Sequence, residues 1–142
     1  MPVELPIGLS LILCDTTIED VRTKKKSLIG LFTQISAEKF PYTHPKMDVL
    51  VTLTGCCGPV PCTITCSEDG AEKPLVSVNF MVNAKSPRDV ADVVLSIQSM
   101  RFPAPGLYIF RVLADGVPFM MRPVNVRQRT AHPSTSNASE QS

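Results

Sequence analysis

The chain has 142 residues, of which 44% are hydrophobic and 6% aromatic, with no tryptophan. This length suffices for one domain with a hydrophobic core and is too short for two ordinary ones. The formal net charge is +1, so no global field favours nucleic acid or an anionic membrane. Thirteen prolines exclude long helices, because each proline removes a backbone donor and fixes its own φ.

The first half of the chain predicts short strands at 9–16, 28–36, 47–54 and 60–67. The first is a mostly apolar run that fits a strand buried on both faces, whereas the third and fourth alternate apolar and polar residues. Gly30 marks a bulge or a close backbone approach within the second of these strands. We expect 17–27 to be a solvated connection, and Pro41 and Pro45 to break the chain before the third strand. In the fourth strand, Cys62, Ile64 and Cys66 are predicted to share the buried face.

The second half predicts strands at 75–83, 107–114 and 117–126. The segment 86–100 is ambiguous, since Ser86, Pro87 and Asp89 match the start of a capped helix. Its high content of β-branched residues favours a turn at 86–89 followed by a strand. The dipeptide Asp115-Gly116 predicts a two-residue hairpin turn.

Pro118 and Pro123 predict that 117–126 is an edge strand, because proline cannot donate to a central ladder. From Arg127 onward the composition is polar and low in apolar residues, which indicates a disordered tail. We therefore predict a β-domain over 1–126 and a tail over 127–142. The strand count and the regular turn spacing are typical of a two-layer sandwich or a barrel.

The sequence around Leu95 to Ile97, Met100 and 105–112 resembles the corner between strands E and F of immunoglobulin-like sandwiches. In those domains a tyrosine that opens strand F hydrogen-bonds back to upstream backbone. The resemblance implies an all-β, immunoglobulin-like or fibronectin-III-like antiparallel β-sandwich of about 7–9 strands, in which Tyr108, beside Gly106, is a structural lock. The paired cysteines and core tryptophan of antibody domains are missing, which excludes a true antibody-type domain.

The segments 13–16, 18–20, 26–32 and 102–108, with Arg22, make the whole chain resemble a family of small bacterial proteins of unknown function. This resemblance implies a bacterial cytosolic protein and brings no activity, cofactor or site with it. The chain also lacks the roughly 18–20 consecutive apolar residues that span a bilayer. Its apolar start is interrupted by proline and glycine, which argues against a signal peptide. We predict a cytoplasmic protein without a membrane partner, whose cysteines are reduced.

Four cysteines, Cys56, Cys57, Cys62 and Cys66, lie close enough in sequence to suggest a zinc site. If 60–67 is a strand, however, Cys62 and Cys66 lie roughly 13 Å apart, whereas thiolates on one zinc lie about 4 Å apart. We therefore predict neither a metal site nor a cofactor. Cys56 and Cys57 lie between glycines in an expected exposed turn, where they could be reactive thiols with His44 as a possible base.

The most distinctive polar feature is a charged run, in which Asp15, Glu19 and Asp20 face Arg22, Lys24, Lys25 and Lys26. It is either a solvated loop with compensating charges or a docking surface whose basic half contacts an acidic protein or a phosphate backbone. Nucleic acid would require aromatic stacking partners or a larger basic excess, so protein contact is favoured.

The sequence contains no catalytic constellation, since it lacks a Gly-rich phosphate loop, G-x-S-x-G and H-E-x-x-H. We predict a non-enzymatic interaction or structural module, whose edge strand or loops bind another protein or a second copy. One alternative is a thiol-based redox protein or enzyme that uses Cys56 or Cys57. The other is weak nucleic-acid binding through the basic loop 22–26.

Overall fold

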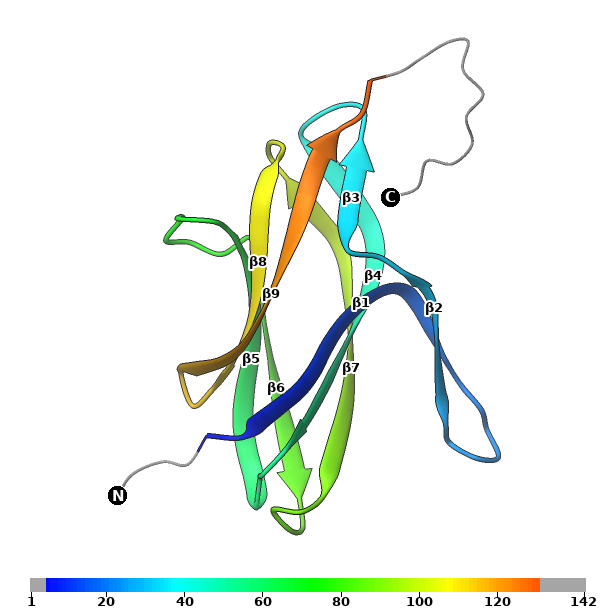
Figure 1. Cartoon of the computed structure of the whole chain (residues 1–142), viewed down its shortest axis with the longest axis vertical. Helices are drawn as coiled ribbons and strands as arrows, with labels where there is room; N and C mark the ends of the chain where they lie inside the picture. Colours follow the sequence, from blue (N-terminus) through cyan, green and yellow to red (C-terminus); the bar gives the residue numbers. More distant parts are fainter. Residues whose placement is uncertain (1–4, 131–142) are drawn as a thin grey trace.

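The computed structural model describes residues 5–130 and folds them into a β-sandwich (Figure 1). The strands are β1 (Ile7–Glu19), β2 (Lys26–Leu31), β3 (Gln34–Ala37), β4 (Tyr42–Thr54), β5 (Gly58–Glu68), β6 (Val76–Ala84), β7 (Val90–Phe102), β8 (Gly106–Ala114) and β9 (Val117–Gln128). One sheet has the order β2-β1-β4-β7 and the other the order β3-β9-β8-β5-β6. The predicted all-β class is confirmed.

The core is aliphatic and lies between the inner faces of the two sheets. Met47, Val49, Val51 and Leu53 of β4 are all 0% exposed, as the period-two pattern predicts. From the other sheet, Ile64, Phe110 and Val112 are equally buried. Cys62 and Cys66 share the buried face of β5 with Ile64, as predicted.

The ambiguous segment is a turn followed by the strand β7, and the helical alternative is wrong. The Oδ2 atom of Asp89 accepts from the backbone N–H groups of Lys85 and Ser86, and the Ser86 hydroxyl accepts from the N–H of Arg88. These are the hydrogen bonds of a helix start. Here they close an isolated turn, because the β-branched residues that follow favour a strand.

Two local features stabilise the connections around β8. Asp115 and Gly116 both have positive φ, 52° and 81°, which is the backbone of the favoured two-residue hairpin between β8 and β9. At the other end of β8, the Tyr108 hydroxyl donates to the carbonyl of Ala104 at 2.6 Å. The Tyr108 ring also packs edge-on against Phe102, with the ring centroids 5.0 Å apart.

The segment 28–36 is not one strand, since the chain changes sheets at Phe32 and Thr33. β2 pairs with β1 in the first sheet, whereas β3 pairs with β9 in the second. The β3–β9 pair is parallel, so the sandwich is not wholly antiparallel.

β9 is an edge strand over only part of its length, which corrects the prediction for 117–126. β3 pairs with Asn125 to Gln128, so this end of β9 is internal to its sheet and extends beyond the predicted domain end at 126. Pro118 and Pro123 lie in the part that β3 leaves uncovered, where a missing donor costs no ladder hydrogen bond. The remainder of the predicted tail, from 131, lies outside the described residues.

β4 begins at Tyr42, so Pro45 does not break the chain and His44 lies in a strand instead of a loop. The pairing of β4 with β1 ends at Asp48, whereas its pairing with β7 continues to Tyr42. Proline is tolerated at position 45 because that side of β4 has no neighbouring strand.

The predicted connection 17–27 is shorter in the structure, because both of its ends belong to strands. β1 continues to Glu19 and β2 begins at Lys26, so only residues 20–25 connect them. β1 pairs with β4 up to Cys14 and with β2 from Cys14 onward. The β1–β2 ribbon therefore projects from the sandwich as an arm formed by residues 14–31 (Figure 1).

Candidate functional site

The tip of the arm is a turn fixed by backbone hydrogen bonds. The Oδ1 atom of Asp20 accepts from the N–H groups of Arg22 and Thr23 at 2.8 and 3.0 Å. The carbonyl of Asp20 accepts from the N–H of Lys24, and its own N–H donates to the carbonyl of Lys25. The hydrogen bonds from the Thr23 and Arg22 N–H groups lower the pKa of the Asp20 carboxyl, because they stabilise its charged form. The turn therefore holds the backbone of its basic residues in a defined arrangement.

Among the described residues, no ion pair involves a basic side chain of the tip. In the part of the chain that the structure describes, the ion pairs join Lys46 to Asp48 and Arg129 to Glu38. Residues 19–26 contain two acidic and four basic residues, a net charge of +2, and all are exposed. The tip thus brings six of the seven predicted docking residues together: Glu19, Asp20, Arg22, Lys24, Lys25 and Lys26.

Asp15, the seventh predicted docking residue, lies at the base of the arm. It lines a small cleft together with Gly30, Phe32, Gln34 and His44. Gly30 has φ 76°, and a β-carbon at this position would collide with the Asp15 carboxylate, so glycine is required. The charge of Asp15 favours protonation of His44, but burial outweighs it and lowers the pKa of His44.

His44 has a different partner from the one expected for a catalytic base. Its Nδ1 atom lies 3.1 Å from the Tyr42 hydroxyl, and its ring lies 5.8 Å from that of Phe32. The described hydrogen bonds and the cleft around His44 include no cysteine. A thiol–imidazole pair is therefore not formed.

The two candidate thiols differ in exposure. Cys57 is exposed, whereas Cys56 is 4% exposed and belongs to the core, which corrects its placement in an exposed turn. Burial raises the pKa of Cys56, and it raises the pKa of Cys62 to about 11 and of Cys66 to about 12. Such thiols stay protonated at neutral pH and are poor nucleophiles. Within residues 5–130, no group of three or more histidine, cysteine or acidic residues could hold a metal ion.

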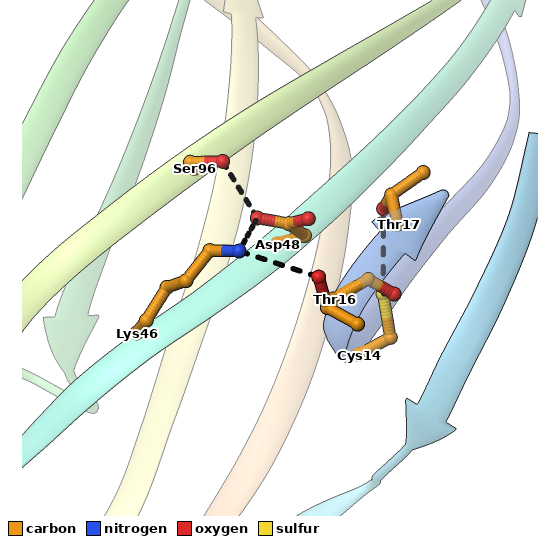
Figure 2. Close-up of polar contacts among 6 residues, drawn as sticks. All are labelled: Cys14, Thr16, Thr17, Lys46, Asp48 and Ser96. Carbon is orange, nitrogen blue, oxygen red and sulfur yellow. Dashed lines mark hydrogen bonds and ion pairs between the residues drawn. The ribbon is translucent and has the colours of Figure 1, made fainter. Parts of the chain in front are cut away.

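A buried carboxylate connects the base of the arm to the sandwich (Figure 2). Asp48 is 3% exposed, accepts from the Ser96 hydroxyl at 2.6 Å and lies 3.7 Å from the Lys46 ammonium. Lys46 also donates to the Thr16 hydroxyl at 3.3 Å. Burial alone would raise the pKa of Asp48, but the hydrogen bonds from Ser96 and Thr17 and the Lys46 charge outweigh it and lower that pKa. The contacts of this cluster join β1, β4 and β7 and give it a structural role.

The free edges of the two sheets are the remaining candidates for binding. Most are protected by features that hinder strand addition. β3 has four residues, β2 contains Lys26 and the left-handed Gly30, and β7 contains the left-handed Ser99 followed by Arg101. The uncovered part of β9 contains two prolines. Its Arg122 side chain also donates to the carbonyl of Leu11 in β1 at 3.3 Å.

β6 lacks such protection. Its sequence, VSVNFMVNA, has neither a proline nor a charged residue, and its one neighbour among the described strands is β5. Val76, Val78 and Phe80 pack against the core but are only half-buried. On the outer face, Met81 is 59% exposed. Period-two alternation in the sequence predicts this strand. It does not predict the position of the strand at the edge, because edge position depends on the order of strands in the sheet.

The family of the chain follows from a comparison with family models. Residues 9–127 match the model of DUF6941, a family of unknown function. The chain belongs to this family. The match spans the arm, all nine strands at least in part, and β9 up to residue 127. No curated protein matches the chain. Among residues 5–130 there is no helix long and apolar enough to cross a membrane.

Proposed function

We propose that this DUF6941 protein is a non-enzymatic interaction module that binds another protein chain by strand addition at β6. The observation that carries the proposal is the unprotected edge of this strand. An unpaired row of N–H and C=O groups is a template for a further strand, and natural proteins usually block such an edge. We propose β6 in place of β9 as the binding edge, since β9 is partly covered and carries the prolines.

The chemistry of the other candidates supports this choice. The buried thiols have raised pKa values, and His44 contacts Tyr42 instead of a cysteine. The basic tip of the arm has no aromatic residue among 20–26 on which a base could stack. Protein binding therefore has more structural support than thiol chemistry or nucleic-acid binding.

We further propose that the sandwich is immunoglobulin-like. The Tyr108–Ala104 hydrogen bond supports this, because it is the contact that the resemblance to the E-to-F corner implies. We also propose that the protein is bacterial and cytoplasmic. The resemblance to a family of small bacterial proteins supports the first point, and the unpaired state of all five cysteines supports a reducing compartment.

A pair of matched lysine substitutions tests binding at β6. Met81 on β6 and Met121 on β9 are 59% and 58% exposed, so Met81→Lys and Met121→Lys introduce the same charge at equal exposure. Each variant serves as bait in an extract of the source organism. We expect the wild type and Met121→Lys to capture the same partner, and Met81→Lys to capture it about ten-fold less, since lysine on an edge opposes strand pairing. Equal capture by the two variants would reject β6 as the binding edge.

A further inference from the structure

Two exposed surfaces of the molecule carry opposite charge and lie on opposite sides of the sandwich. The tip of the arm, residues 19–26, has a net charge of +2. Glu68 at the end of β5 and the loop residues Asp69, Glu72 and Lys73 are exposed and together carry a net charge of −2. In Figure 1 the arm and the β5–β6 loop project on opposite sides of the molecule, so they cannot neutralise each other within one chain.

The arm also has an apolar face for which the sandwich offers no cover. Ile29 faces Thr16 across the ribbon, and Ile18 faces Ser27, so both isoleucines lie on a face that carries no charged residue of β1 or β2, and Lys46 of β4 reaches this face at Thr16. They are 51% (Ile18) and 46% (Ile29) exposed. At the tip Val21 is 81% exposed beside the basic side chains. This combination of cationic and aliphatic residues fits an acidic protein surface with apolar neighbours.

The β5–β6 loop provides such a surface. Its shape is fixed by backbone hydrogen bonds, from Asp69 N–H to the Leu107 carbonyl at 2.9 Å and from Leu75 N–H to the Cys66 carbonyl at 2.7 Å. Leu75 of the loop and Val76 at the start of β6 line an open cleft together with residues of β7, among them Gln98 and Arg101. The loop leads directly into β6, the unprotected edge.

We propose that the arm of one copy docks onto the β5–β6 loop of a second copy. This proposal rests on the proposed function, because it names a second copy of the chain as a partner of the β6 edge. Val76 opens β6, so contact between the tip and the loop brings the second copy to the start of the unprotected edge. The two surfaces differ, so the contact is heterologous and each copy keeps a free arm or a free loop. The expected assembly grows with concentration and does not stop at a closed dimer.

Charge reversal in the purified protein tests the contact by sedimentation velocity at low ionic strength. The arm variant combines Arg22→Glu with Lys25→Glu, and the loop variant combines Asp69→Lys with Glu72→Lys. The Asp20 turn uses the backbone N–H of Arg22, so the arm variant leaves its hydrogen bonds in place. We expect wild-type association to weaken with added salt, and each variant alone to associate about ten-fold more weakly. An equimolar mixture of the two variants should associate again, because each acidic surface then meets a basic one.

Failure of the contact can be separated from failure of edge binding. A wild type that stays monomeric at every concentration, association unchanged in both variants, or a mixture no better than its components would each overturn the arm–loop contact. Met81→Lys is measured in the same assay. If this variant weakens association while the charge reversals do not, the proposal of edge binding at β6 stands and the arm–loop contact is rejected. The neutral variant Arg22→Gln with Lys25→Gln controls for folding, and we expect its association to be intermediate.

Discussion

The body of the sandwich and the β1–β2 arm use the same kinds of strand residues in opposite ways. In the body, Val49, Val51 and Ile64 are 0% exposed and are enclosed by both sheets. In the arm, Ile18, Ile29 and Leu31 are 51%, 46% and 63% exposed. A two-stranded ribbon without a covering layer gains little from its apolar residues, so its order depends on its turn and on its base.

The comparison separates residues that stabilise the fold from residues that are available to a partner. Substitutions in the body should change the free energy of unfolding. Substitutions in the arm should leave this free energy nearly unchanged and alter association instead. Each of the following predictions tests a part of this division.

The largest expected effect is the loss of a core side chain. Phe110→Ala should lower the free energy of unfolding by about 3–5 kcal/mol, because Phe110 is 0% exposed and its removal leaves a cavity. Leu31→Ala in the arm should change it by less than about 0.5 kcal/mol. Urea titrations of both variants measure the difference. Similar losses in the two variants would show that the arm is part of the cooperative core.

The junction of arm and body depends on Asp48. Asp48→Asn should cost about 1.5–3 kcal/mol at neutral pH, since the charge-assisted hydrogen bonds to this buried carboxylate are replaced by weaker ones. The pKa of Asp48 is lowered in the folded protein, so its contribution is present above the ordinary value of 3.8 and is lost as the pH falls through the folded value. Urea titrations above and below pH 3.8 measure both effects. A wild type and a variant with parallel pH dependence would contradict this role.

The corner before β8 should contribute less. Tyr108→Phe removes the hydroxyl that donates to the Ala104 carbonyl but keeps the ring against Phe102. We expect a loss of about 0.5–1.5 kcal/mol in the free energy of unfolding, the usual net contribution of one hydrogen bond. Thermal unfolding monitored by circular dichroism measures it. A loss as large as that of Phe110→Ala would mean that Tyr108 does more than lock the corner.

The smallest effect on stability is expected at the tip of the arm. Asp20→Ala removes the acceptor of the Arg22 and Thr23 N–H groups, so these amides should exchange faster with solvent. The midpoint of global unfolding should not move. The pKa of Asp20 is lowered, so acidification of the wild type below 3.8 should loosen the tip in the same way. Amide exchange followed by NMR measures both, and unchanged exchange at Arg22 and Thr23 would contradict this account of the turn.

Local patterns predicted the elements of the body well. Period-two alternation located β4, β5 and β6, and the positive φ that Asp115 and Gly116 adopt accounts for the predicted hairpin. These features depend on interactions within a strand or between neighbours in sequence.

The features that were missed depend on the order of strands in the sheets. Pro45 is tolerated because β1 leaves β4 at Asp48, and the chain splits at Phe32 because β2 and β3 join different sheets. From the sequence, a bulge explains glycine at position 30 as well as a close approach does. The Asp15 carboxylate lies beside Gly30 in the structure, and its position depends on how the strands pair. The free edge of β6 also depends on strand order. No residue within β6 indicates that β5 is its one neighbour among the described strands.

The central claim, that β6 is the binding edge, is tested most directly by hydrogen–deuterium exchange across a concentration series of the wild-type protein. We predict that amides within 76–84 become protected as association proceeds, while those of the uncovered part of β9, 117–124, exchange at an unchanged rate. A bound strand would satisfy the unpaired β6 groups and slow their exchange. Association without added protection in 76–84, or with protection confined to β9, would contradict the claim.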